Sequence, residues 1–561
     1  MTVSVGQATE REGHAVQKAK TDWVYVEWSK ANRIVRNLQQ RIYRRAQQKD
    51  WQAVKGLTRL LLKSYSNLLV SVRQVTVLND GRKTPGIDGQ VVLKDEDRSK
   101  LVDELRQIKI WQAKPVRRIY IPKAKGGKRP LGIPTIKDRV LQCVVKNAYE
   151  PRFEAEFEAK SYGFRPGRST WDAIEEVYKA LNNSVLGRNQ FILDADIKGA
   201  FDHISHDFIL QKIGQMPGRM LVKQWLKAGY VEYGRLHETL EGTPQGGVIS
   251  PLLANIALDG LQAHLGKGYR YMRYADDFVV MAKTREAIEE ALPKVRAFLA
   301  ERGLELNQEK TKIVHKRDGF DFLGFHVQDR KGKLLITPQR EKMKALINRL
   351  RTWLKQNRQV SPETVVRVLN PILRGWANYY STSVAKETFE DVEHEVWKVL
   401  WRWARRRHPK KPKRWVLQEY FTKVNRENYV FFAEIESRRG RKTKITIEQV
   451  ARVPIMRHRK VKGKASPFDP TLRQYWEKRT QQKAMRQMVR REREIAEAQD
   501  WKCKCCRESL GNGLALEIHH RIPIRQGGTD EPGNLVWLHT ACHRTLHKEE
   551  RVTERRSARA V

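Results

Sequence analysis

The sequence has no long hydrophobic run and no recognisable export signal. No window approaches the roughly 18 consecutive apolar residues that span a bilayer. Residues 1–14 are polar and mixed in charge, unlike a signal peptide. We therefore expect a soluble, intracellular protein with no transmembrane segment and no membrane partner.

Cysteine is scarce, and most of it lies at one end of the chain. Of the five cysteines in 561 residues, Cys143 stands alone in an apolar stretch and is expected to be a small buried side chain. Cys503, Cys505, Cys506 and Cys542 crowd the C-terminal part. This distribution argues against a secreted disulfide framework and indicates metal ligation.

Acidic residues are few beside basic ones. The chain has 64 Asp and Glu against 109 Lys and Arg, a formal net charge of +45 that is spread over much of its length. Such an excess destabilises a compact state by self-repulsion unless a polyanion neutralises it, and it exceeds what solubility requires. We therefore expect nucleic acid, bound over a large surface, as a partner. A hydrophobic fraction of 40% is sufficient for several packed domains.

The sequence pattern changes several times along the chain. Residues from about 23 to 75 show the periodicity of two basic amphipathic helices. From about 84 to 327, strand-like runs alternate with helical stretches, which predicts an α+β catalytic domain. A helical region rich in tryptophan and arginine follows to about 427, and then a very basic linker or DNA-contacting arm at about 437–464. A charged helix from about 471 to 498 leads into the cysteine-rich end.

Two acidic segments stand out in the α+β region. Tyr271–Val280 places Asp276 and Asp277 between two apolar, strand-forming arms, which is the pattern of a hairpin with acid at its turn. Phe191–Asp202 begins as an apolar strand and delivers Asp196 at its end. If the two strands pair, the three carboxylates meet, and two divalent cations there could clamp the oxygens of a phosphoryl transfer. Magnesium is the natural ion, although an Asp-Asp pair on its own is more commonly a solvated turn.

Two further segments accompany the acidic ones. Arg117–Pro134 reads as two strands around a Gly126-Gly127 turn, whose basic residues could project towards a triphosphate. Gly242–Asn255 lies between the acidic segments, and its paired glycines would allow close backbone approach to a ligand. Each segment alone could be a structural turn, but their order in one chain favours a polymerase.

In this combination the chain resembles the reverse transcriptases of mobile group II introns, from Trp23 almost to its end. The likeness extends to the following segments: Thr84–Gly89, Leu304–Lys312, Phe322–Gly324 and Arg374–Tyr380, the last of which is similar to the maturase thumb that grips intron RNA. Aromatic and arginine side chains suit that task because they stack on unpaired bases and neutralise phosphates. Helical core packing is the alternative for any single tryptophan.

The resemblance implies roles for individual residues. It implies that two Mg²⁺ ions are held by Asp196, Asp276 and Asp277. Phe201 matches the aromatic residue that excludes a 2′-hydroxyl in this family, so the product is expected to be DNA. Contacts to the incoming deoxynucleoside triphosphate are implied for Lys123, Lys128, Arg129, Phe201 and Gln245.

The C-terminal cysteines form part of a zinc-binding pattern. Cys503 and Cys506 are one C-x2-C pair, and His539 and Cys542 offer a second pair of ligands at the same spacing. Four such ligands make a closed tetrahedral zinc site, which is structural because no position remains for water or substrate. Cys505 is left over.

Between the two pairs, the segment Leu516–Pro523 and the residues that follow resemble the HNH endonuclease motif. The resemblance implies that His520 is the general base that activates water and that Asn534 orients it. A catalytic divalent ion, for which Mg²⁺ is one candidate, would be held by His519, His543 and His547. His539 stands where this motif usually has cysteine, which zinc tolerates. The alternative is a zinc module that binds DNA without cutting it.

The expected fold is multi-domain α+β: a right-hand polymerase, an α-helical thumb, a basic DNA-binding segment and a ββα-metal zinc module. The expected boundaries are 1–69 for a basic helical extension, 70–330 for fingers and palm, 331–430 for the maturase thumb, 431–495 for the basic segment and 496–561 for the HNH module. By resemblance, the partners are group II intron RNA and target DNA, and the location is the bacterial cytoplasm, with the nucleoid. A splicing-only maturase and a reverse transcriptase of a non-intron element are the rival functions.

Overall fold

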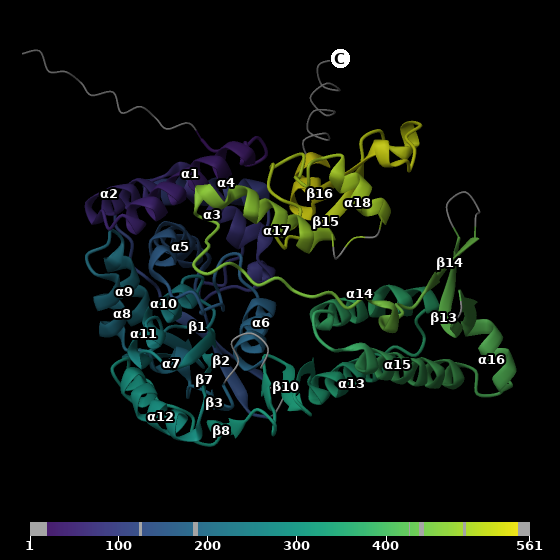
Figure 1. Ribbon diagram of the computed structural model, residues 1–561. Coiled ribbons are helices and arrows are strands. Elements are labelled where there is room, and N and C mark those ends of the chain that lie inside the picture. Colours follow the sequence, from purple (N-terminus) through teal and green to yellow (C-terminus); the bar gives the residue numbers. More distant parts are fainter. Residues whose placement is uncertain are drawn as a thin grey trace, which may run out of the picture.

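The computed structural model describes residues 20–122, 126–182, 189–425, 427–436, 442–485, 488 and 490–547. A polymerase body, a long thumb arm and a C-terminal module beside the N-terminal helices are distinguishable in Figure 1. Within the described residues, no helix combines the length and the apolar character needed to cross a bilayer.

The N-terminal region forms three helices where the sequence predicts two. They are α1 (Trp28–Gln47), α2 (Trp51–Leu62) and α3 (Tyr65–Arg73), followed by the short η1 (Gln74–Leu78), η2 (Asp80–Lys83) and α4 (Asp95–Gln107). The extra break has a local cause, because the side chain of Asp50 caps α2 by accepting from Ala53 N–H. Ser64 caps α3 in the same way through Asn67 N–H. These helices pack on α5 (Ile136–Glu156).

The palm is built on a four-stranded sheet with strand order β6-β7-β3-β8. The strands are β3 (Phe191–Ala195), β6 (Arg270–Tyr274), β7 (Asp277–Ala282) and β8 (Lys312–His315). Both faces are buried: Ile192 and Val279 join the core shared with the thumb, whereas Leu193 and Val280 join the core under the N-terminal helices. The sheet therefore packs against the thumb on one face and against the helices of the N-terminal region on the other, and the predicted carboxylates lie at its edge.

A second sheet, with strand order β2-β1-β4-β5, forms the fingers. Its strands are β1 (Val116–Pro122), β2 (Lys128–Ile133), β4 (Tyr230–Glu232) and β5 (Arg235–His237). The helices of the fingers and palm are α6 (Thr170–Leu181), α7 (Ala200–His203), α8 (His206–Ile213), α9 (Arg219–Lys227), α10 (Ser250–Ala257), α11 (Leu261–Leu265) and α12 (Arg285–Ala300). Of these, α12 packs on β3 and β7, and α6 packs on β6.

The thumb extends away from the palm as an arm of long helices (Figure 1). It begins after a three-stranded sheet of β9 (Phe320–Phe322), β10 (Phe325–Arg330) and β11 (Lys333–Pro338). Its helices are α13 (Arg340–Gln356), α14 (Pro362–Tyr380), α15 (Lys386–Arg407) and α16 (Lys413–Tyr420). The helical prediction missed a sheet of β12 (Phe421–Val424), β13 (Glu427–Glu436) and β14 (Lys442–Thr446), which closes the arm. Its buried residues include Phe431 and Ala433, which pack into the thumb core.

Part of the very basic segment is bound to the palm. The buried carboxylate of Asp172, on α6, accepts hydrogen bonds from Val461 N–H (2.8 Å) and His458 Nε2 (2.9 Å), and it pairs with Arg479. Burial acts to raise the pKa of Asp172, but the His458 hydrogen bond and the Arg479 charge outweigh it and lower the pKa to about 2. Because this carboxylate is ionised and paired, residues 458–461 are anchored where the sequence predicts a linker or arm.

Two helices, α17 (Arg473–Met485) and α18 (Arg490–Glu497), precede the C-terminal module. Its hairpin consists of β15 (Leu516–His520) and β16 (Leu535–His539), and residues 540–547 are helical. The remaining short turns of helix are η3 (Val450–Arg452), η4 (Pro470–Leu472), η5 (Ile524–Gln526) and η6 (Pro532–Asn534). The module thus has the predicted ββα order.

Candidate active sites

The palm sheet brings the three predicted carboxylates together. β3 and β7 are antiparallel, with Ala195 opposite Phe278, so the next position of each strand sets Asp196 beside Asp277. The pairing of Tyr274 with Asp277 closes the hairpin, which leaves Asp276 in the two-residue turn. The sheet edge therefore carries a cluster of carboxylates, as the strand-pairing prediction requires.

A fourth carboxylate, Asp194, belongs to this cluster and was missed from the sequence. Burial and the charges of Asp277 and Asp196 raise its pKa to about 7. Partial desolvation by the surrounding protein and the charges of Asp276 and Asp196 likewise raise the pKa of Asp277 to about 6, although solvent still reaches its side chain. Lys310 Nζ lies 2.8 Å from Asp196 Oδ2 and supplies one cation. Such mutually repelling oxygens fit hard divalent cations such as Mg²⁺.

The turn that carries Asp276 is held from behind by buried polar contacts. Ala275 has a left-handed backbone, with φ of 58°. The fully buried Arg273 donates from Nη1 to Ala275 O (2.9 Å) and to Asn255 Oδ1 (2.9 Å). Asn255 in turn donates to Gly163 O (2.9 Å). The backbone at Gly163 thus supports the turn that carries Asp276, a contact that the sequence did not predict.

Gly163→Ala should disable polymerisation through this support. A Cβ at Gly163 would collide with the backbone nitrogen of Ala275, and backbone cannot move aside cheaply. We expect primer extension to fall about 100-fold, because displacements of about 1 Å have effects of that size. Gly56→Ala is the matched control, because its Cβ would meet nothing within 4 Å. Equal extension rates for the two variants would show that the turn does not depend on Gly163.

Phe201 and Gln245 line one cavity of about 330 Å³, which β1, α9 and the segment 238–245 also line. Phe201 lies on α7, half-buried, and its ring meets the edge of Phe164 at a centroid distance of 6.1 Å. Phe164, which the sequence analysis did not single out, has a φ of 60° and an exposed ring. The two rings lie side by side. Thr243 N–H donates to Phe201 O (2.7 Å), which holds the backbone that carries the Phe201 ring.

The predicted basic contacts lie at the tip of the β1–β2 hairpin. Lys128 and Arg129 are exposed at the start of β2, and the Arg129 charge acts to lower the pKa of Asp277. Lys123 lies outside the described residues. The glycines of Gly242–Asn255 lie against other protein atoms rather than against open space. For example, a Cβ at Gly242 would meet the backbone of Asp202. Of these glycines, Gly242 also lines the cavity beside Phe201.

The predicted zinc ligands converge in the C-terminal module. One ligand atom from each of Cys503, Cys506, His539 and Cys542 lies within 4.8 Å of the others, and all four side chains are buried. Three thiols and an imidazole are the donors that zinc prefers, so the set fits a closed structural site. Cys505 is half-buried and outside the set.

A second cluster, formed by His519, His543 and His547, lies on the hairpin and the helix that follows it. His543 Nε2 is 3.1 Å from His519 Nδ1 and 3.0 Å from His547 Nε2. Its other nitrogen, Nδ1, is 2.6 Å from Glu517 Oε2. A carboxylate in that position fixes the tautomer and turns the free nitrogen toward a metal. Glu517 was missed, although it precedes His519 by two residues on the same strand.

His520 contacts a carboxylate that the sequence did not single out. Its Nε2 lies 2.8 Å from Asp530 Oδ1. Asn534, the predicted orienting residue, instead binds backbone: Oδ1 accepts from Ile522 N–H (2.9 Å), and Nδ2 donates to Ile522 O and Thr529 O. Asn534 therefore holds the loop that carries Asp530, and Asp530 is the group positioned to orient His520.

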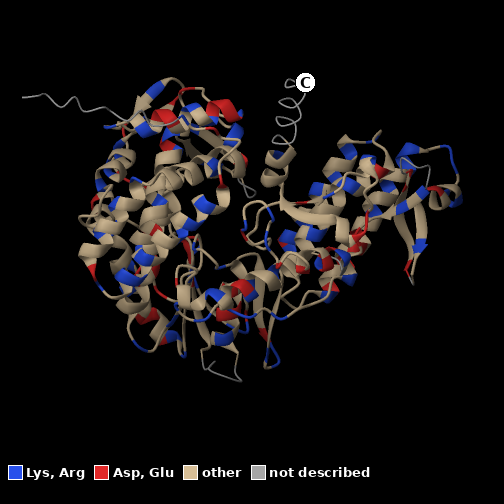
Figure 2. Cartoon of the chain, turned by 90° about the horizontal axis from the view of Figure 1, so that it is seen from above, with Lys and Arg blue, Asp and Glu red and all other residues tan. Residues whose placement is uncertain are grey.

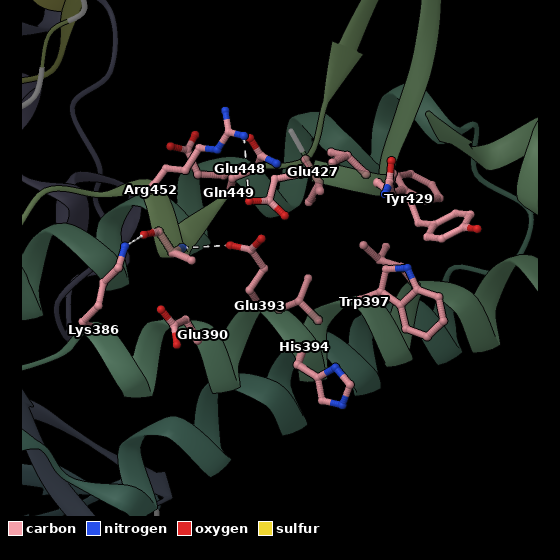
Figure 3. A pocket seen from close by; sticks show the side chains of 17 residues that line it. Lys386, Glu390, Glu393, His394, Trp397, Glu427, Tyr429, Glu448, Gln449 and Arg452 are labelled. Atoms are coloured by element: carbon pink, nitrogen blue, oxygen red, sulfur yellow. Dashed lines mark hydrogen bonds and ion pairs between the residues drawn. The ribbon is translucent and has the colours of Figure 1, made fainter. Parts of the chain in front are cut away.

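Lys and Arg positions are spread over the body and the thumb arm (Figure 2). One thumb surface departs from this pattern: a cavity of about 600 Å³ beside α15 has walls that include Glu390, Glu393, Glu427 and Glu448 (Figure 3). Glu393 accepts from Ala451 N–H (2.8 Å), and burial raises its pKa. These glutamates outnumber the cations of the same lining, Lys386 and Arg452, so this side of α15 is a less favourable surface for phosphate than the basic surfaces of the thumb.

Family models match four successive regions. They are the "N-terminal domain of reverse transcriptase" at residues 23–105, "Reverse transcriptase (RNA-dependent DNA polymerase)" at 121–327, "Group II intron, maturase-specific domain" at 343–421 and "HNH endonuclease" at 503–549. A solved telomerase from Candida albicans, in complex with a fragment of telomeric RNA, is 14% identical over 55% of this chain and 61% of that chain, with a TM-score of 0.31.

Two curated relatives extend the match. Protein YkfC of Escherichia coli is 34% identical over 302 residues, which are 46% of this chain and 79% of YkfC. The group II intron-encoded protein LtrA of Lactococcus lactis is 28% identical over 404 residues, which are 54% of this chain and 66% of LtrA. With both enzyme domains present, the chain is an RNA-directed DNA polymerase and a DNA endonuclease, and it belongs to the family of group II intron-encoded reverse transcriptases and maturases.

Proposed function

We propose that the chain binds its own group II intron RNA, assists splicing, nicks a target DNA with the HNH module and extends the new 3′ end by copying the RNA. The observation that carries this proposal is the presence of two complete candidate sites in one chain: the palm carboxylates and the nuclease histidines. Such a role requires access to chromosomal DNA, which agrees with a location at the bacterial nucleoid.

In the polymerase site, Asp196, Asp276 and Asp277 would hold Mg²⁺, with Asp194 adding charge beneath them. Bound Mg²⁺ supplies the charge that activates the primer 3′-oxygen and stabilises the leaving pyrophosphate. The protein side chains would position the incoming nucleotide and select its sugar. Arg129 and Lys128 would bind the triphosphate, and the Phe201 ring would lie against the sugar.

The nuclease site would separate metal binding from proton transfer. His519, His543 and His547 would hold one divalent ion, and that ion supplies charge to the scissile phosphate. His520 would take the proton of the attacking water at Nδ1, because its Nε2 faces Asp530, and Asp530 would stabilise the resulting imidazolium. The neighbouring zinc site would keep the hairpin folded.

Intron RNA would lie on the basic side of the thumb. Between α13 and α15, a pocket of about 230 Å³ offers five cations to a phosphate backbone: Arg351, Lys355, Arg358, Arg402 and Arg406. This pocket contrasts with the glutamate-lined cavity beside α15, which disfavours phosphate. The charge pattern thus supports a preferred RNA-binding side.

Phe201→Ala tests whether this ring selects deoxynucleotides. Removing the ring would open space beside the sugar, so incorporation of ribonucleotides relative to deoxynucleotides should rise roughly 10- to 200-fold. The measurement is single-nucleotide extension with each nucleotide in turn. Phe201→Tyr keeps the ring and should keep the selectivity, whereas unchanged selectivity in Phe201→Ala would remove Phe201 from this role.

Primer extension and strand nicking, measured on the same preparation, test the proposal. A splicing-only maturase would bind the intron RNA and accelerate splicing without extending any primer. A non-intron reverse transcriptase would extend primers but would show no preference for a group II intron RNA. Only the proposed function predicts extension, nicking and intron-specific binding together.

A further inference from the structure

Arg73, the last residue of α3, reaches from the N-terminal helices to a predicted zinc ligand. Its Nη2 lies 3.0 Å from the sulfur of Cys542, although 469 positions separate the two residues. The guanidinium also stacks on Trp28, with its carbon 4.4 Å from the ring centroid. Arg73 is only 7% exposed, so this contact is shielded from solvent. The polymerase body therefore touches the zinc site directly.

The surroundings of this contact are apolar and shared by both ends of the chain. Trp28 and Val72 belong to one hydrophobic core with Cys503, Trp537 and Cys542. Within the described residues, no carboxylate forms an ion pair with Arg73 at 4.0 Å or less. A buried guanidinium without a counter-charge is costly, so the sulfur is its main compensation.

Charge balance supplies the reason for the contact. Zinc ligands are deprotonated, and three thiolates with one neutral imidazole give a Zn²⁺ centre a net charge of minus one. That charge would be buried, because the side chains of Cys503, Cys506, His539 and Cys542 are all at most 2% exposed. One arginine beside Cys542 would neutralise such a centre and orient its ligand.

We propose that Arg73 is a positioning residue of the zinc centre, which makes zinc retention by the nuclease module depend on its docking against the polymerase body. The proposal rests on the assignment of zinc to this site. Because binding linkage is reciprocal, removal of zinc should also loosen the contact between α3 and the module. Zinc here would stabilise the nuclease fold and its position on the polymerase.

Zinc transfer from the full-length protein to a colorimetric chelator tests this. Arg73→Met keeps the apolar stem and removes the charge, and it should release zinc roughly 10- to 100-fold faster than wild type, the range for groups that support a metal ligand. Arg73→Lys keeps the charge and should fall between the two. The matched control is Arg36→Gln, which removes the exposed ion pair with Glu508 between the same regions but touches no zinc ligand. It should release zinc at the wild-type rate.

The outcomes separate the inference from the zinc assignment. Less than one zinc per wild-type chain would refute the assignment itself. Bound zinc with equal release from wild type and Arg73→Met would overturn the role of Arg73, and so would equally fast release from Arg73→Met and Arg73→Lys. Primer extension checks that each variant is folded, because Arg73 lies outside the carboxylate site. Hydrogen exchange in α3 should rise in Arg73→Met and in wild type stripped of zinc; unchanged exchange would overturn the coupling to docking.

Discussion

Replacement of both turn carboxylates, Asp276→Ala with Asp277→Ala, should abolish primer extension on an RNA template. The strand register sets Asp277 beside Asp196, and loss of two of these carboxylates removes the groups that would hold Mg²⁺. We expect the rate to fall by on the order of 10³-fold or more, because preorganised charge at a phosphoryl-transfer site has effects of that size. Single-turnover extension with deoxynucleotides and magnesium measures it.

Asp207→Asn is the matched control for this experiment. Asp207 is an exposed carboxylate on α8, eleven positions along the chain from Asp196, and it is not part of the cluster. Its removal should leave extension unchanged. The double variant should also keep wild-type nicking. Persistent extension by the double variant would contradict the assignment of the polymerase site.

His520→Ala should abolish DNA nicking and leave the extension of a supplied primer intact. His520 is the group proposed to accept the proton of water, and loss of a general base lowers rates by roughly 10²- to 10⁴-fold. Asp530→Asn should give a smaller loss, because it removes only the partner that orients the imidazole. Cleavage of a supercoiled plasmid carrying the target site measures both.

The relative effects of these variants distinguish the two proposed orienting groups. Asn534→Ala should act by loosening the loop, because its side chain binds the backbone of Ile522 and Thr529. Its defect should therefore grow with temperature, whereas the defect of Asp530→Asn should not. Wild-type nicking by His520→Ala would rule out His520 as the base, and loss of both nicking and extension would point to misfolding.

The sequence predicts those parts of the sites that lie within continuous segments. Asp196 and Asp277 each adjoin an apolar strand, so hydrophobic pattern alone predicts that pairing brings them together. Asp194 and Glu517 were missed but could have been found, since each lies two positions from a candidate ligand and therefore on the same strand face. The alternation of side chains along a strand thus identifies site residues that single motifs leave out.

Other contacts could not be predicted because they join distant segments. Asp530 reaches His520 only through a loop shaped by the contacts of Asn534. Arg73 meets Cys542 only because the C-terminal module folds back onto the first helices. The β13–β14 hairpin was missed for another reason: the strongly basic sequence at 438–444 resembles a linker, although β13 itself carries the buried apolar run Val430–Ala433.

The most direct test of the account is target-primed synthesis by the full-length protein reconstituted with its intron RNA. The substrate is an unnicked DNA target, supplied with deoxynucleotides and magnesium, and the product measured is cDNA joined covalently to the cleaved DNA strand. We expect this product from the wild type. We expect it neither from the Asp276→Ala/Asp277→Ala variant nor from His520→Ala. A wild-type protein that nicks DNA and extends supplied primers, but never extends its own nick, would contradict it.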